Sequence, residues 1–302
     1  MTAVSLGRLL TAMVTPFKPI EGEPIDFEAV DRLVDHLIDT GTQGLVVRGT
    51  TGESPTLSHE EDYALYRRVK TRVAGRVPVI AGTGSNCTRT AVTATQEAIR
   101  IGVDAVMLVV PYYNKPSQAG LLAHFRTLAR ECPIPMILYN IPGRTGVNML
   151  PETVAELSKL PTIVAVKEAS GNLEQVRAIR AMTREDFLIY SGDDALTLEI
   201  MRLGGHGVIS VASHVAGRLM RTLIDHIVAG QGDEATRLNQ SLQTLFQNLF
   251  CTTNPVPVKA ALDMLGLCAP TVRLPLVGCT ATERACVHQA MDALGLLVRV
   301  SR

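Results

Sequence analysis

The 302-residue sequence contains no tryptophan and few other aromatic residues, and its 29 basic and 29 acidic side chains cancel. Nucleic-acid-binding proteins usually present a basic surface or aromatic stacking platforms, so we expect no nucleic-acid partner. No apolar run approaches the roughly 20 residues that a membrane-spanning helix requires. Residues 1–10 also lack the pattern of a secretion signal. We therefore expect no membrane partner and a cytoplasmic location.

Ligand patterns for metals are also missing. The six cysteines are scattered, with no C-x-x-C pair and no Cys/His spacing of a zinc site, which indicates free thiols in a reducing compartment. The seven histidines show no paired spacing either. Asp193 and Asp194 could form a carboxylate pair, but they precede a helical segment, where Asp194 is favoured as an N-cap. We expect no metal and no cofactor.

Short β-branched runs alternate with helical patterns along most of the chain. Each run is almost continuously apolar, as is typical of parallel strands that are covered on both faces. The predicted strands are residues 10–14, 45–47, 79–81, 105–110, 136–139, 163–166, 187–190 and 208–211. The segments between them carry apolar residues at helical spacing. Asp26 and Ser117 are expected helix caps, and Ser58-His-Glu-Glu61 is a capping box.

Eight strand–helix alternations within about 230 residues predict an α/β fold, a closed (β/α)8 TIM barrel. An open doubly wound sheet is the alternative, but no G-x-G-x-x-G follows the first strand. After about Gly230 the strand pattern stops, and helices are predicted over residues 234–250, 256–265 and 282–296. We therefore expect a catalytic barrel over residues 1–230 and a C-terminal helical region over residues 231–302.

Reactive side chains follow the predicted strands at their carboxyl ends, the face on which barrel active sites are built. Lys167 directly follows one strand, where burial would lower the pKa of its amine and free it to form a Schiff base with a carbonyl. Tyr139 ends the preceding strand, and with Thr50, Tyr113 and Arg144 nearby it could relay protons. Taken singly, the alternatives are a lysine that reaches solvent and an ordinary core tyrosine.

Two loops offer groups for binding carboxylates. Gly49-Thr-Thr-Gly-Glu53 supplies backbone amides and two hydroxyls in a tight turn, which suits a small carboxylate. Arg144 follows Pro142 in a rigid loop and could form a two-pronged contact with a second carboxylate. An ordinary turn and an ordinary surface arginine are the alternatives.

Six stretches together resemble the dihydrodipicolinate synthase family of pyruvate-dependent Schiff-base aldolases, in order and spacing, over residues 10–296. They are Gly49-Thr-Thr-Gly-Glu-Ser54, Pro111-Tyr-Tyr-Asn114, Tyr139-Asn-Ile-Pro-Gly-Arg-Thr-Gly146, Val166-Lys-Glu-Ala-Ser170, Ser191-Gly-Asp-Asp194 and Gly204-Gly-His-Gly-Val-Ile-Ser210. The resemblance implies a lyase that condenses pyruvate with L-aspartate-4-semialdehyde in lysine and diaminopimelate biosynthesis. It also implies a homotetramer assembled as a dimer of dimers.

The same resemblance assigns roles to individual residues. Lys167 would form the imine with pyruvate, whose carboxylate would rest on Thr50 and Thr51. Tyr139 and Thr50 would form a proton relay with Tyr113, contributed across a dimer interface. Arg144 would orient the carboxylate of the semialdehyde. The backbone carbonyl of Gly192 and the apolar side chain of Ile209 would line the pocket.

Three residues depart from the family pattern. Arg48 stands where a small or neutral residue is usual, and the sequence does not explain it. In members inhibited by lysine, the inhibitor lies at the dimer interface between residues matching Ser54, His59, Asn86 and Tyr112. Thr90 replaces a glutamate that pairs with the inhibitor's ammonium group, and Asp62 replaces a frequent histidine. We therefore predict weak or absent inhibition by lysine, unless Asp62 supplies the missing charge.

Other activities remain as alternatives. N-acetylneuraminate lyase and 2-keto-3-deoxy sugar acid aldolases share the lysine and tyrosine. Their pattern at the Gly49–Glu53 loop is instead Gly-Ser-Thr-Gly-Glu, and they lack the arginine of Gly-Arg-Thr-Gly. Thr50 and Arg144 therefore favour the synthase, since an amino-acid aldehyde carries a carboxylate and a polyol does not. A non-catalytic barrel that acts as a binder or sensor is the second alternative, because a fold alone does not determine function.

Overall fold

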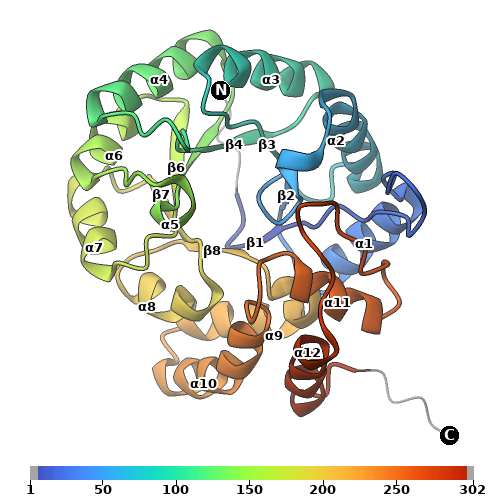
Figure 1. The fold of residues 1–302 in the computed structure, drawn as a ribbon. Helices are drawn as coiled ribbons and strands as arrows, with labels where there is room; N and C mark the ends of the chain where they lie inside the picture. The colour runs from blue at the N-terminus through green and yellow to red at the C-terminus, as the bar shows by residue number, and fades with distance from the viewer. Residues whose placement is uncertain (1–5, 298–302) are drawn as a thin grey trace, which may run out of the picture.

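In the computed structural model, which describes residues 6–297, eight parallel strands close into a barrel in chain order (Figure 1). The strand β1 pairs with both β2 and β8, so the predicted (β/α)8 barrel is confirmed and the open sheet is excluded. The strands are β1 (Leu9–Ala12), β2 (Leu45–Val47), β3 (Val79–Gly82), β4 (Ala105–Val109), β5 (Met136–Asn140), β6 (Ile163–Glu168), β7 (Leu188–Ser191) and β8 (Gly207–Ser210).

Alternate residues of each strand face opposite sides of the barrel wall, because side chains in a strand repeat every two residues. Leu10 and Ile137 point into the barrel, whereas Leu9 and Leu138 pack beneath the surrounding helices. Apolar side chains therefore cover both faces of the sheet, which explains why the strands appear in the sequence as continuous apolar runs.

Helices surround the barrel (Figure 1). They are α1 (Phe27–Asp39), α2 (His59–Val73), α3 (Thr88–Ile101), α4 (Gln118–Glu131), α6 (Pro151–Ser158), α7 (Leu173–Met182), α8 (Thr197–Arg202) and α9 (Ser213–Val228), with the short α5 (Pro142–Thr145) and the 3-10 turns η1 (Ser54–Thr56) and η2 (Asp194–Leu196) in loops. The predicted caps are present: Asp26 and Ser117 accept backbone amides, and Ser58 with Glu61 forms the capping box.

Two local predictions were wrong. Lys167 lies within β6 rather than after it, because the ladder continues and pairs Lys167 with Tyr190 of β7. Asp194 is not an N-cap. Asp193 caps η2 through the Ala195 amide, whereas the buried Asp194 carboxylate accepts the backbone amides of residues 211 and 212 at 2.9 and 2.8 Å. The two backbone amides just after β8 stabilise the Asp194 carboxylate inside the protein, because hydrogen bonds to a charged acceptor are strong.

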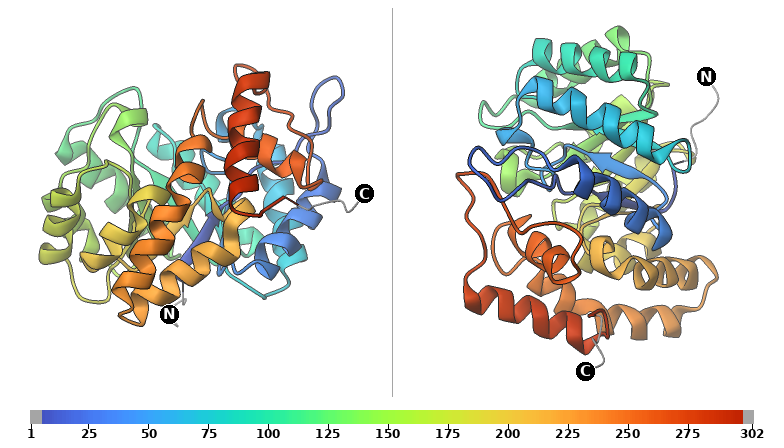
Figure 2. Two further views of the ribbon diagram at one scale, coloured as in Figure 1. Left: turned by 90° about the horizontal axis from the view of Figure 1, so that it is seen from below. Right: turned by 90° about the vertical axis from the view of Figure 1, so that its right-hand side faces the viewer.

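The C-terminal segment forms three helices, close to those predicted: α10 (Gly232–Asn248), α11 (Val256–Met264) and α12 (Ala281–Ala293). They lie together on one side of the barrel (Figure 2), with α10 and α11 packed against α9. Within residues 6–297, no helix has both the length and the apolar character needed to cross a membrane. The division into domains at residue 230 stays a prediction.

Candidate active site

Lys167 and Tyr139 meet inside the carboxyl end of the barrel. The two residues pair in register on β6 and β5, so their side chains leave neighbouring strands on the same face. Only 5% of the Lys167 surface and 4% of the Tyr139 surface are exposed. The Lys167 Nζ atom lies 4.4 Å from the centre of the Tyr139 ring. An amine and a phenol are therefore held together in a site largely shielded from water.

The interior changes the proton affinity of the amine. Burial lowers the pKa of Lys167 to about 8, and the Arg144 guanidinium contributes in the same direction, while the Asp194 carboxylate acts against it. About a tenth of such amines carry no proton at pH 7, compared with fewer than about one in a thousand for an ordinary lysine. Lys167 can therefore act as a nucleophile near neutral pH.

Tyr139 is a proton donor rather than a phenolate. Burial raises the pKa of Tyr139 to about 12, although the Arg144 guanidinium and the Thr50 hydroxyl act in the opposite direction. Thr50, Tyr139 and Arg48 line one small cavity at this end of the barrel. The phenol can thus protonate an oxygen that forms next to Lys167, and Thr50 is placed to pass a proton onward.

Two further residues named from the sequence lie in the same region: Gly192 beside the Lys167 side chain and Ile209 in the barrel interior. Gly192 follows β7, and a Cβ atom built on it would lie 3.2 Å from the Cε atom of Lys167 and 2.6 Å from the Cβ atom of Ala169. A larger residue would therefore displace the lysine side chain. Ile209 of β8 is buried in the same interior cluster as Tyr139.

The loop that begins at Gly49 is held by residues from the distant C-terminal region. The Asn254 amide donates to the buried Thr51 hydroxyl at 2.9 Å. Glu53 forms a buried ion pair with Lys259 of α11, and its second oxygen accepts the Arg273 backbone amide at 3.0 Å. Sequence reasoning missed Asn254 and Lys259, because no local motif connects them to the loop.

Tyr113 is not brought to this site by its own chain. Its side chain is 89% exposed, and its backbone lies in the left-handed region, with a φ of 72°. Within one chain the structure therefore assembles Tyr139 and Thr50 but not the third member of the predicted relay.

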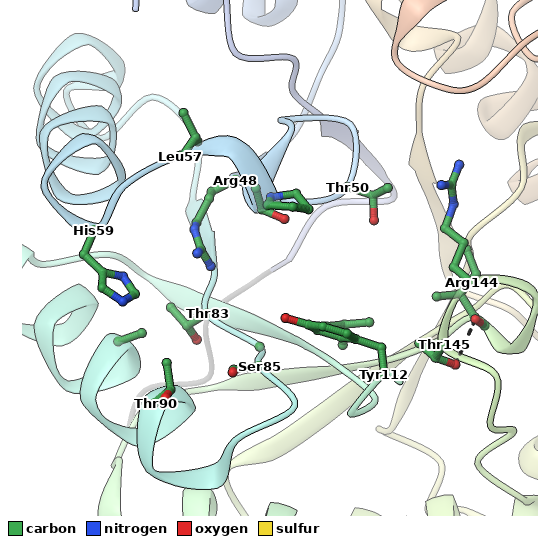
Figure 3. A pocket seen from close by; sticks show the side chains of 16 residues that line it. Arg48, Thr50, Leu57, His59, Thr83, Ser85, Thr90, Tyr112, Arg144 and Thr145 are labelled. Carbon is green, nitrogen blue, oxygen red and sulfur yellow. Dashed lines mark hydrogen bonds between the residues drawn. The ribbon is translucent and has the colours of Figure 1, made fainter. Parts of the chain in front are cut away.

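A second cavity, of about 430 Å³, opens beside the barrel mouth (Figure 3). Arg48 and His59 lie on one side of it and Arg144 on the other, with Thr50 and Tyr112 between them. Ser54 and Thr90 also line this cavity, whereas Asn86 is not among the lining residues.

The structure explains Arg48. Its Nε atom lies 2.5 Å from the Asp62 carboxylate, and its Nη1 atom donates to the Gly82 carbonyl at 3.0 Å. The Asp62 side chain is 3% exposed, and among residues 6–297 its only other ion-pair contact is the His59 imidazole, at 3.6 Å. Arg48 and Asp62 are thus two departures from the family pattern that neutralise each other.

The depressed pKa of Lys167 predicts a specific pH dependence. The unprotonated amine is the reactive form, so the rate of imine formation should rise with pH, reach half its maximum near pH 8 and level off above it. An unperturbed lysine would continue to gain rate up to about pH 10.4. Rapid-mixing measurements with a limiting concentration of a simple α-keto acid test this, and a rate that still climbs at pH 10 would contradict it.

Sequence comparison identifies relatives along the full chain. The model of the dihydrodipicolinate synthetase family matches residues 5–294. The chain belongs to this family. A 4-hydroxy-tetrahydrodipicolinate synthase of Moorella thermoacetica is 53% identical over 96% of this chain and 99% of that one. Another, from Cyanothece sp., is 51% identical over 97% of this chain and 99% of that one.

A solved structure agrees with these relatives. The family member from Cyanidioschyzon merolae, crystallised with lysine bound, superimposes with a TM-score of 0.95 at 50% identity, over 97% of this chain and 99% of that one. The family predicted from the six stretches is confirmed, and so is the prediction of a lyase with synthase activity. The relatives favour this activity over the sugar-acid aldolases and over a non-catalytic binder.

Among residues 6–297, no group of three or more His, Cys, Asp or Glu side chains could hold a metal ion.

Proposed function

We propose that the protein condenses pyruvate with L-aspartate-4-semialdehyde in lysine and diaminopimelate biosynthesis in the cytoplasm, through a Schiff base on Lys167. The observation that carries this proposal is the buried Lys167 amine, whose pKa is near 8, beside the protonated phenol of Tyr139. Amine and phenol supply the nucleophile and the acid that imine formation requires.

The first half of the reaction follows from this geometry. The uncharged Lys167 amine attacks the ketone carbon of pyruvate. The carbonyl oxygen takes one proton from this amine and one from the Tyr139 phenol and departs as water, which leaves a protonated imine and a Tyr139 phenolate. The positive imine nitrogen then draws electrons from the neighbouring methyl carbon, which gives a proton to the Tyr139 phenolate and becomes part of an enamine. The hydroxyls of Thr50 and Thr51, in the loop that follows β2, would hold the pyruvate carboxylate.

The second half joins the two substrates. The enamine carbon attacks the aldehyde carbon of the semialdehyde, which restores the protonated imine on Lys167, and the aldehyde oxygen takes a proton from Tyr139. The amino group of the bound semialdehyde then displaces the Lys167 nitrogen from the imine carbon, which closes the ring and frees the enzyme. Arg144 lines the adjoining cavity beside Thr50 and would hold the carboxylate of this second substrate.

We also propose that Tyr113 completes the relay of a second copy of the chain and that the protein is a homotetramer built of two dimers. The exposed ring of Tyr113, together with Tyr112, which is 41% exposed, places an aromatic surface next to the barrel mouth. Sedimentation velocity measures the assembly. Loss of activity in a Tyr113→Phe variant that keeps its oligomeric state would support the shared relay.

Borohydride reduction in the presence of pyruvate tests the central step. We expect a stable adduct on the peptide that contains Lys167, whereas a non-catalytic binder would give none. A coupled assay should then show turnover of pyruvate with aspartate semialdehyde and none with N-acetylmannosamine or a sugar aldehyde. Turnover with the sugar substrates alone would overturn the proposed specificity.

Replacing Arg144 with alanine should separate the two substrates. A charge-assisted hydrogen bond contributes roughly 1.5–3 kcal/mol, so the KM for the semialdehyde should rise about 10- to 100-fold, with a much smaller change for pyruvate. Steady-state kinetics with each substrate varied in turn measures this. Arg126→Ala, which removes a surface arginine paired with Glu156, is the control and should change neither constant. Equal losses for both substrates would contradict the role of Arg144.

We propose that inhibition by lysine is weak. The lysine site implied by the resemblance is the cavity beside Ser54, His59 and Tyr112, in which Thr90 provides no charge. The Asp62 carboxylate is engaged by Arg48 and buried, so it is not available to a ligand's ammonium group. An inhibition constant in the low micromolar range would contradict this, and Thr90→Glu should increase sensitivity.

A further inference from the structure

The Thr51 hydroxyl accepts a hydrogen bond but donates none within residues 6–297. Thr51 is 3% exposed, and its hydroxyl accepts a hydrogen bond from the Asn254 amide nitrogen at 2.9 Å. A hydroxyl has one proton to donate. Within residues 6–297 no acceptor for that proton is found among the hydrogen bonds of the protein. Because Asn254 occupies a lone pair of this oxygen, the proton must point away from Asn254.

The surroundings keep this arrangement in place. Asn254 is 6% exposed and lies just before α11. Two residues after Thr51, the Glu53 carboxylate is bound by Lys259 and by the Arg273 amide, so the loop is attached to the C-terminal region at two points. Asn254 and Thr51 therefore meet between two segments that the Glu53 contacts hold together, and the Thr51 hydroxyl is the only hydrogen-bond partner of the Asn254 side chain among residues 6–297.

We propose that Asn254 is a positioning residue that directs the Thr51 hydroxyl proton toward the carboxylate of the α-keto acid bound at Lys167. This inference rests on the proposed function. Asn254 does not itself touch the substrate: it acts by holding the Thr51 oxygen as an acceptor on one side, so that the hydroxyl donates on the other. The binding group is ready before the substrate arrives, which lowers the cost of ordering it.

The test compares Asn254→Ala with the wild-type chain in the trapping reaction with pyruvate. The pyruvate concentration that gives half-maximal adduct formation should rise about tenfold, the typical loss for a hydrogen bond to a charged group. The rate at saturating pyruvate should stay within about twofold of the wild-type rate, since Lys167 and Tyr139 are untouched. Asn254→Asp, which cannot donate to Thr51, should weaken binding as well, and wild-type behaviour of this variant would overturn the proposal.

Two further variants distinguish a positioning role of Asn254 from a general disturbance of the fold. In a Thr51→Val background, Asn254→Ala should add less than about a twofold effect, because the hydroxyl on which it acts is gone. An undiminished effect there would overturn the proposal. Asn248→Ala removes a similar amide that donates to the Cys286 carbonyl at 3.0 Å, and it should leave the half-maximal concentration unchanged.

The outcomes also distinguish this inference from the proposed function. If wild-type protein forms no adduct with pyruvate, the proposed function fails. If wild-type protein forms the adduct and Asn254→Ala binds pyruvate equally well, only the inference about Asn254 fails. Thermal unfolding of each variant confirms that it is folded.

Discussion

Replacing Lys167 with methionine should reduce turnover by a factor on the order of 10³ or more, because the only other buried lysine among residues 6–297, Lys259, is engaged in an ion pair with Glu53. Methionine keeps the apolar stem that packs against Tyr139 and the space left by Gly192. It removes the nitrogen, which burial already penalises in its charged form, and exchanges one methylene for sulfur. The variant should therefore remain as stable as the wild-type protein, and the loss should be chemical rather than structural.

Turnover, trapping of pyruvate and thermal unfolding should be measured together for this variant. Lys159→Met is the matched control, because this lysine lies on the surface in contact with Glu156 and should behave as wild type in all three measurements. A Lys167→Met variant that kept a tenth of wild-type turnover, or that still gave a reducible adduct with pyruvate, would show that the imine forms elsewhere.

Replacing Lys259 with methionine should lower the free energy of unfolding by about 3–5 kcal/mol, the usual result of removing one member of a buried ion pair. Both side chains of the Lys259–Glu53 pair are fully buried. The Lys259 ammonium also donates to the Thr271 carbonyl at 2.8 Å and lies 4.1 Å from the centre of the Phe17 ring. Without it, the Glu53 carboxylate would remain buried with only one backbone amide to stabilise its charge.

Urea unfolding measures this effect, and a double variant isolates its cause. Adding Glu53→Gln to Lys259→Met removes the unpaired charge and should restore a large part of the lost stability. Arg126→Met breaks a pair that is about half exposed and should cost less than about 1 kcal/mol. If Lys259→Met and Arg126→Met lost equally little stability, the buried pair would have no special role in holding the loop.

The barrel could be predicted from the sequence because its signals are local. Continuous apolar runs mark strands that are covered on both faces, and the caps at Asp26, Ser58 and Ser117 mark helix starts. The closeness of Lys167 and Tyr139 could also be predicted, since parallel strands that are neighbours in the chain are neighbours in the barrel, and the sequence pattern places both residues near the carboxyl ends of their strands.

The remaining features depend on contacts between distant segments. Asp194 follows a local pattern typical of a cap, but its amide partners lie at the end of β8 and approach it only in the folded barrel. Arg48 and Asp62 were noted as separate departures, and their opposite charges were the signal that could have linked them. Asn254 and Lys259 lie in a helical region whose sequence carries no sign of a role at the barrel mouth.

The attachment of the Gly49 loop to the C-terminal region has a consequence for the order of events during synthesis. Asn254 and Thr51 are 203 residues apart, and Lys259 and Glu53 are 206 residues apart. A nascent chain on the ribosome thus exposes the threonine loop long before the residues that fix it have been translated. The contacts that hold the loop can form only after residues 254 and 259 have emerged, so a chain that stops before them lacks both attachments.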